Sequence, residues 1–194
     1  MSIKKVKVYI HKKEVLYISN ILSISRLVLL PFIIFFLTKD NYTYRVLTII
    51  LMSIAVLTDA LDGFLARRLK IESALGKMLD PIGDKFSLGA VAIAVTIYRD
   101  FPWWAMGFII FRDMGIIVCG LFMVERWTII TSSNIWGKAT SFFQAMAIMA
   151  YAFEMPYRSY PLTVALMFTG VSAISYGFEF YNLAKTQIKN DNNK

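Results

Sequence analysis

Four aspartates in the second quarter of the chain have a spacing that suits cation chemistry. Asp59 and Asp62 are three residues apart, and Asp80 and Asp84 are four residues apart. Residues three or four apart on a helix lie on the same face, so each pair would present two carboxylates to one side. Two such faces turned toward each other would bring four carboxylates into one small polar cavity.

These four carboxylates require a counter-charge. Each lies at or just inside the end of a strongly apolar segment, where an ionised side chain costs several kcal/mol. Unpaired neighbours would also repel one another until some took up protons. A divalent cation removes both costs, and an all-carboxylate ligand set favours Mg²⁺ or Mn²⁺ over zinc. Two such ions would hold a pyrophosphate and neutralise charge during an in-line displacement at phosphorus.

Small residues and a cation accompany the aspartates. Gly63 follows Asp62 inside a predicted helix, where glycine costs about 1 kcal/mol relative to alanine. Its use would be the close approach of a ligand to the backbone. Ala66 is small and shares the face of the first aspartate pair, and Arg67, one turn beyond Gly63, suits a phosphate.

A structural alternative is that the aspartates only form salt bridges with nearby basic residues. Those residues are Arg67, Arg68, Lys70 and Lys77. For a single Asp–Arg pair at a helix end this alternative would be preferred. Four spaced carboxylates with two glycines between apolar segments favour the metal site instead.

The elements that must position these residues are apolar helices. The chain has 194 residues, of which 57% are hydrophobic and 18% charged, whereas soluble domains are about a quarter charged. Most of six apolar segments approach the ~20 residues that cross a hydrocarbon core, and spanning segments must satisfy their own backbone groups as helices. The segments are Ile18–Thr38, Val46–Leu65, Leu79–Ile97, Trp103–Val124, Ala139–Phe153 and Leu162–Leu183.

The predicted fold is therefore an all-α integral membrane bundle of six transmembrane helices. Residues 1–16 would form a basic interfacial segment with a short helix, and residues 17–184 the transmembrane domain. Residues 185–194 would be a polar tail that frays.

The basic residues predict an orientation. With six spans, the side that carries both termini has 17 of the 21 Lys and Arg residues, and the other side has Lys39, Arg45, Arg99 and Arg158. The positive-inside rule places the richer side, and with it both termini and the aspartates, in the cytoplasm. A basic rim facing anionic headgroups explains the net charge of +8, so we do not expect nucleic-acid binding.

The aspartates belong to a longer pattern. Asp59-x2-Asp62-Gly63-x2-Ala66-Arg67-x8-Gly76-x3-Asp80-x3-Asp84 specifies eight positions over 26 residues. This pattern resembles, position for position, the signature of the CDP-alcohol phosphotransferase family. Six spans and cytoplasmic termini are similar to that family as well, so the resemblance covers nearly the whole chain.

The resemblance implies a reaction and its residues. Asp59, Asp62 and Asp80 would ligate two Mg²⁺ or Mn²⁺ ions with help from Asp84, which would also be the general base for the acceptor hydroxyl. The donor would be CDP-diacylglycerol, and CMP would leave after attack on the lipid-side phosphorus. A homodimer in a bacterial-type inner membrane is implied too. The CDP part of the donor would be held by Asp62, Gly63, Ala66, Arg67 and Gly76.

Two further stretches bear on the acceptor alcohol. Asn20–Arg26 at the start of the first segment and Gly137–Gln144 at the start of the fifth resemble bacterial phosphatidylglycerophosphate synthases. Arg112, Lys138 and Arg26 could bind an anionic acceptor such as glycerol 3-phosphate. The alternatives are that Asp113 merely neutralises Arg112 and that Lys138 only sets topology.

The chain departs from those synthases at several positions. They carry an Arg–Glu pair at Arg112-Asp113, a second arginine at Gly120 and a second basic residue at Thr140. The Arg112-Asp113 pair and the Ser172–Tyr176 stretch also resemble CDP-diacylglycerol-dependent cardiolipin synthases, whose acceptor is phosphatidylglycerol. That acceptor is therefore the second candidate.

A different class is an ion-coupled transporter, because intramembrane carboxylates also mark ion pathways. Transporters more often show inverted repeats and broken helices at the midplane. The aspartates here cluster near one predicted membrane face, where a soluble nucleotide can reach them. An enzyme is therefore favoured.

Overall fold

The structure is a computed structural model that describes residues 18–69, 74–127 and 135–192. Within these ranges, side chains are described over residues 25–58, 83–123 and 136–186 and at Arg126. The predicted N-terminal interfacial segment, residues 1–16, lies outside the described residues.

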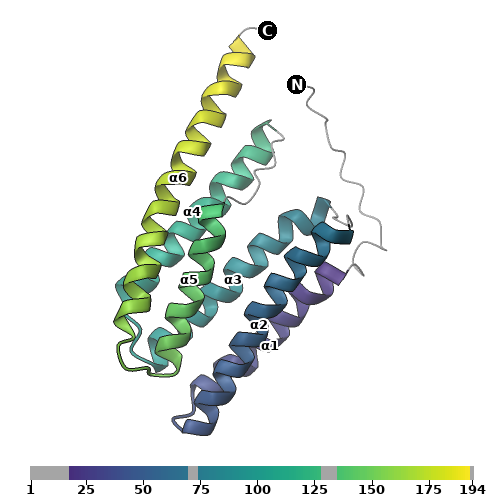
Figure 1. Ribbon diagram of the computed structural model, residues 1–194. Coiled ribbons are helices and arrows are strands. Elements are labelled where there is room, and N and C mark those ends of the chain that lie inside the picture. Colours follow the sequence, from purple (N-terminus) through teal and green to yellow (C-terminus); the bar gives the residue numbers. More distant parts are fainter. Residues whose placement is uncertain (1–17, 70–73, 128–134, 193–194) are drawn as a thin grey trace. The chain divides into compact units, whose positions relative to one another are not determined.

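Six α-helices account for almost all of the described residues, which contain no strand (Figure 1). Each helix coincides with one of the apolar segments found in the sequence, so the all-helical prediction is confirmed. The helices are α1 (Ile18–Leu37), α2 (Tyr42–Leu69), α3 (Ala74–Tyr98), α4 (Trp103–Trp127), α5 (Ile135–Ala152) and α6 (Ser159–Asn192).

Several helices extend beyond the apolar runs that predicted them. Helix α2 continues to Leu69, and α3 begins at Ala74, so both include the polar residues near their connection. Helix α6 continues to Asn192, which corrects the expectation that the tail frays from residue 185. The tail contains neither glycine nor proline, and lysines near a helix C-terminus favour its dipole.

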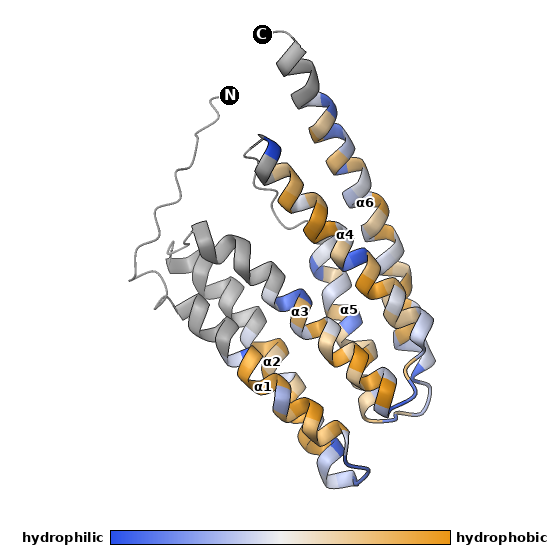
Figure 2. Cartoon of the chain, turned by 180° about the vertical axis from the view of Figure 1, so that it is seen from behind, coloured by the Kyte–Doolittle hydropathy of each residue, from blue (hydrophilic) through white to orange (hydrophobic). Residues whose placement is uncertain are grey.

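Two helices are long and apolar enough to cross a membrane, judged by length and composition. They are the stretches Trp103–Met123 and Ser159–Thr186, while Ser25–Leu37 and Tyr42–Thr58 are shorter apolar helices. Figure 2 shows hydrophobic residues dominating the helix bodies and hydrophilic residues gathering in the connections. Within the described residues, two of the six predicted spans therefore meet this criterion.

The chain divides into two compact units. One comprises α1, α2, α3, the first turn of α4 and residues 148–158. In this unit α1 packs against both α2 and α3. Ile33 and Leu37 of α1 are buried, as is Val95 of α3. The other unit comprises residues 107–147 and α6.

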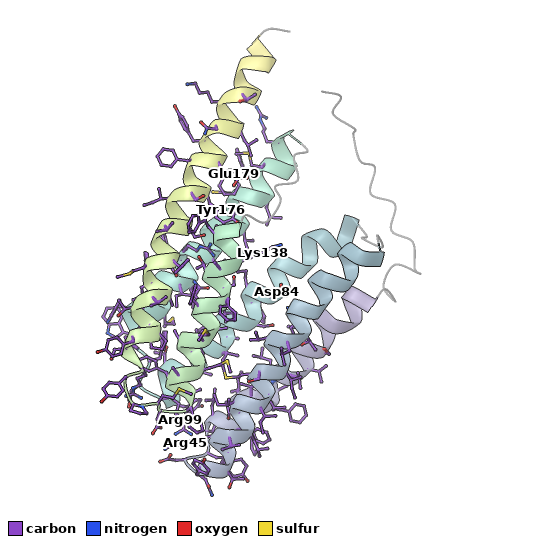
Figure 3. All side chains as sticks on the ribbon, in the orientation of Figure 1. Arg45, Asp84, Arg99, Lys138, Tyr176 and Glu179 are labelled. Carbon is purple, nitrogen blue, oxygen red and sulfur yellow. The ribbon has the colours of Figure 1, made fainter. Side chains whose placement is uncertain are left out.

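The first unit contains a cluster of four charged residues that we call the loop clamp: Asp40, Arg45, Arg99 and Glu154. Arg99 Nη1 donates to Asp40 Oδ1 at 3.1 Å and to Glu154 Oε1 at 3.0 Å. Arg45 pairs with Asp40 at 2.5 Å and with Glu154 at 2.6 Å. Figure 3 labels Arg45, near the start of α2, and Arg99, just after the end of α3, beside each other. The clamp thus joins the α1–α2, α3–α4 and α5–α6 connections.

Glu154 belongs to the clamp because of an unusual helix end. Helix α5 ends in a Schellman motif, in which Glu154 N–H donates to Tyr151 O and Met155 N–H donates to Ala150 O, both at 2.9 Å. Glu154 takes the left-handed position of this motif, with φ 56°, where glycine is the usual residue. A side chain there is disfavoured by roughly 1–2 kcal/mol, and the two arginine contacts offset that cost.

In the second unit, α5 and α6 are joined by buried hydroxyl and amide groups. Thr140 Oγ1 donates to the carbonyl oxygens of Trp136 and Phe168 at 2.7 and 3.0 Å. One turn further on, Gln144 Nε2 donates to Thr169 Oγ1 at 3.1 Å. Such interhelical hydrogen bonds fix the register of apolar helices that gain little from burial against each other.

Candidate functional site

The four aspartates lie on two continuous helices on either side of one connection. Asp59 and Asp62 are in the second half of α2, and Asp80 and Asp84 are in the first half of α3. Because each pair falls within an unbroken helix, the predicted i, i+3 and i, i+4 spacing on one face is the spacing of the backbone. Both pairs also lie within about three turns of the α2–α3 connection.

Most of the predicted metal and nucleotide ligands lie outside the part of the chain whose side chains are described. This holds for Asp59, Asp62, Gly63, Ala66, Arg67, Gly76 and Asp80. Among the described side chains no group of three or more His, Cys, Asp or Glu residues could hold a metal ion. The convergence of the four carboxylates therefore stays a prediction, although the donor chemistry of the set fits a hard divalent ion.

Asp84, the predicted base, has a described environment. Its side chain is 35% exposed, and its Oδ1 accepts a hydrogen bond from Arg26 Nη1 of α1. Arg26 is buried, and a buried guanidinium needs an anionic partner. The pair is possible because α1 packs against α3.

Sequence reasoning assigned Arg26 to the acceptor and did not foresee its pairing with Asp84. The two residues are 58 positions apart, so no local spacing links them. The ion pair can orient the Asp84 carboxylate. A general base must first be placed within reach of the proton that it removes, and only then does its pKa matter.

In the second unit, Arg112 of α4 is the centre of a buried polar group that we call the Arg112 cluster: Arg112, Asp113, Ser172 and Tyr176. Arg112 Nη1 donates to Asp113 Oδ1 at 2.6 Å, and Nη2 donates to the Ser172 hydroxyl of α6. The guanidinium also lies over the Tyr176 ring, 5.6 Å from its centroid. All four residues are buried.

Lys138, the other predicted acceptor cation of this unit, is exposed at the start of α5. It follows Gly137, which is buried against Tyr176. Thr140, at the position of a second basic residue in the synthases that the sequence resembles, is fully buried and hydrogen-bonded to the α6 backbone. This chain therefore uses that position to join two helices, and a charge there would lie inside their interface.

In the sequence, Ser172 and Tyr176 stood out only as the ends of a stretch that resembles cardiolipin synthases, and neither was predicted to be a site residue. They are four residues apart on α6, so the helical period alone puts them on one face. Arg112, which both residues contact, is 60 positions from Ser172 along the chain. The spacing could have predicted the pair, but not the residue they contact.

Comparison with known proteins identifies the family. The family model described as CDP-alcohol phosphatidyltransferase matches residues 16–174, which is most of the chain. This chain belongs to the CDP-alcohol phosphatidyltransferase family. It is accordingly an enzyme of phospholipid biosynthesis that transfers a phosphatidyl group from a CDP-linked lipid to an alcohol, and the transporter alternative is set aside.

Individual relatives carry more specific names. A Mycobacterium tuberculosis protein named a probable phosphatidylglycerophosphate synthase is 33% identical over 161 residues, covering 81% of this chain and 74% of the relative. A CDP-diacylglycerol–glycerol-3-phosphate 3-phosphatidyltransferase of Aquifex aeolicus is 31% identical over 135 residues, covering 69% and 74%. A Drosophila melanogaster protein named a probable CMP-forming cardiolipin synthase is 36% identical over 110 residues, covering 56% of this chain and 33% of the relative.

Proposed function

We propose that this phosphatidyltransferase uses CDP-diacylglycerol as donor and glycerol 3-phosphate as acceptor, producing phosphatidylglycerophosphate and CMP. The observation that carries the proposal is the likeness, over more than two thirds of both chains, to relatives named for this reaction. The relative named a cardiolipin synthase shares a shorter stretch. Phosphatidylglycerol is therefore the second candidate acceptor.

The chain's own residues supply most of the mechanism. Asp84, oriented by Arg26, takes the proton from the acceptor hydroxyl. The acceptor oxygen then bonds to the lipid-side phosphorus as the bond from that phosphorus to the CMP oxygen breaks. Gly63, Ala66, Arg67 and Gly76 hold the CDP moiety together with Asp62.

Asp59, Asp62, Asp80 and Asp84 would hold the divalent ions. When bound, Mg²⁺ or Mn²⁺ neutralises the charge of the pyrophosphate and of the departing CMP. The chemistry of these four side chains supports this assignment. They lie within 26 residues, and carboxylate oxygens are the ligands that hard divalent ions such as Mg²⁺ and Mn²⁺ prefer.

Arg112 and Lys138 are the proposed ligands of the acceptor's phosphate. A guanidinium kept in a dry interior with one carboxylate is costly unless it serves binding or catalysis, and phosphate is the ligand that guanidinium geometry suits best. Arg26, being paired with Asp84, contributes to acceptor binding through that carboxylate. This refines the role that the sequence predicted for it.

We also propose that the protein spans the membrane six times with both termini and the active site cytoplasmic, with residues 17–184 as the transmembrane domain. The positive-inside count supports this orientation. Large apolar side chains face outward on α4 and α6, among them Phe111 and Phe178, which are 80% and 67% exposed. Lipid would cover these faces, and part of them could meet a second copy in the proposed homodimer.

An acceptor panel tests the proposal. Purified protein in detergent, with CDP-diacylglycerol and Mg²⁺ or Mn²⁺, is offered glycerol 3-phosphate, phosphatidylglycerol, serine, inositol and inositol phosphate. We expect CMP release with glycerol 3-phosphate, lost on chelation and in Asp80→Asn. Release with phosphatidylglycerol alone would replace the proposal by the cardiolipin synthase reaction.

A further inference from the structure

Helix α6 holds Arg112 through two side chains on one face. The Ser172 hydroxyl accepts a hydrogen bond from Nη2, and the Tyr176 ring lies beneath the guanidinium. Ser172 is fully buried, and Tyr176 is nearly so. A hydroxyl and a ring face fix the plane of a guanidinium without adding negative charge, because a cation–π contact is made to a neutral group.

Tyr176 also reaches the start of α5. A Cβ added to Gly137 would lie 2.5 Å from the Tyr176 hydroxyl oxygen, 3.0 Å from Cε2 and 3.2 Å from Cζ. Gly137 lies within helix α5 and does not have a positive φ, so its role is space and not backbone freedom. One aromatic side chain therefore contacts both Arg112 of α4 and the residue before Lys138 of α5.

Arg112 keeps one buried donor, its Nε, without a hydrogen-bond partner among the described residues. Among the residues described, Asp113 is its one carboxylate contact, and it is the next residue on the same helix. This ion pair lies within one helix, and the described contacts of Arg112 on α6 are made to the neutral side chains of Ser172 and Tyr176. A guanidinium that is held rigidly and bound to one carboxylate can still attract a phosphate.

We infer that Ser172 and Tyr176 are positioning residues for the acceptor, because they orient the Arg112 guanidinium. Tyr176, packed on Gly137, also sets the position of this guanidinium relative to the start of α5, which carries Lys138. The inference rests on the proposed function, in which these two cations bind the phosphate of glycerol 3-phosphate. It assigns the acceptor specificity of this chain partly to α6, which carries none of the signature aspartates.

The first test separates acceptor from donor. Ser172→Ala and Tyr176→Leu are compared with the wild type in detergent, with Tyr181→Phe as a control on an exposed position of α6. We expect the KM for glycerol 3-phosphate to rise about tenfold in both variants, with the KM for CDP-diacylglycerol within about twofold. Glycerol 3-phosphate should also raise the Tm of the wild type and of Tyr181→Phe more than that of either variant. A proportional rise in both Michaelis constants would overturn the inference.

The second test uses the steric contact. Gly137→Ala is made in the wild type and in Tyr176→Phe, which lacks the oxygen that the new methyl group would meet. We expect a large rise in acceptor KM in the wild-type background and a smaller one beside Tyr176→Phe, because the ring carbons need to move only a few tenths of an ångström. An equal effect in both backgrounds would contradict a positioning role for Tyr176.

The two tests separate the inference from the proposed function. If the wild type releases no CMP with glycerol 3-phosphate, the proposed function fails, and the inference fails with it. If the wild type turns over and the variants show no acceptor-selective effect, only the positioning role is lost.

Discussion

The loop clamp and the Arg112 cluster bury arginines in opposite ways. Arg99 of the clamp contacts two carboxylates, from Asp40 and Glu154, and the carbonyl oxygen of Lys39. Arg112 contacts one carboxylate, one hydroxyl and one ring. Both arginines have a buried Nε without a hydrogen-bond partner among the described residues, so that atom does not distinguish them. The two arginines differ instead in how many carboxylates they contact and in where those carboxylates lie along the chain.

The difference indicates two purposes for a buried charge. Three of the clamp residues come from separate connections and the fourth, Arg45, from the first turn of α2, so the ion pairs of the clamp fix the ends of helices. Asp113 adjoins Arg112 in sequence, and the described contacts of Arg112 on α6 are to the neutral side chains of Ser172 and Tyr176. A buried charge whose one described carboxylate contact comes from its own helix is a functional-site hypothesis, and we therefore expect Arg112 to matter for binding and Arg99 for stability.

The largest expected effect is that of Arg112→Ala on the acceptor. Removing a charge-assisted contact to phosphate should raise the KM for glycerol 3-phosphate roughly a hundredfold, with less change in the KM for CDP-diacylglycerol. Steady-state CMP release against each substrate measures both constants. Equal changes in the two Michaelis constants would mean that Arg112 is not an acceptor ligand. Arg112 and Arg99 would then not differ in purpose as proposed.

Arg99→Ala should do the reverse. Two carboxylates lose a partner that is itself buried, so we expect the Tm in detergent to fall by about 5 °C while both Michaelis constants stay within about twofold. Arg158→Ala, on the connection before α6, is the matched control, because Arg158 contacts the Tyr151 ring and no described carboxylate. A selective loss of acceptor binding in Arg99→Ala would erase the distinction between the two regions.

Lys138→Ala should have a smaller effect than Arg112→Ala. An exposed ammonium is hydrated and screened, so we expect the acceptor KM to rise by less than about tenfold. The effect should weaken at high salt, whereas that of Arg112→Ala should not. An effect on donor and acceptor alike would leave Lys138 with a topogenic role only.

The smallest effect concerns pH and the clamp. The hydrogen bond from Arg45, and then that from Arg99, lowers the pKa of Asp40 below its usual value. A carboxylate with a lowered pKa stabilises the fold above its unfolded pKa of about 3.9, and this contribution is lost as the pH falls through the folded value. Thermal unfolding between pH 6 and pH 3 should therefore show an acid-side loss that is smaller in Asp40→Asn. An identical pH profile in the two proteins would exclude Asp40 from the clamp's stability.

The sequence predicted local features better than long-range ones. Apolar runs located all six helices, and the aspartate spacing fell on continuous helices as expected. Arg26 and Asp84, or Arg99 and Glu154, are more than 50 residues apart, and their contacts follow from packing that no spacing encodes. The backbone conformation of Glu154 could not be predicted locally either, because glutamate disfavours the left-handed position of a helix cap. Its contacts with Arg45 and Arg99 offset that cost, and both arginines are distant in sequence.

The lipid formed from a labelled acceptor shows which reaction this enzyme catalyses. Purified protein is incubated with CDP-diacylglycerol, a divalent metal and ¹³C-labelled glycerol 3-phosphate, and the lipids are analysed by mass spectrometry beside Asp84→Asn. We expect labelled phosphatidylglycerophosphate from the wild type, and none from Asp84→Asn although that variant still binds CDP-diacylglycerol. No labelled lipid from the wild type, or full turnover by Asp84→Asn, would contradict this expectation.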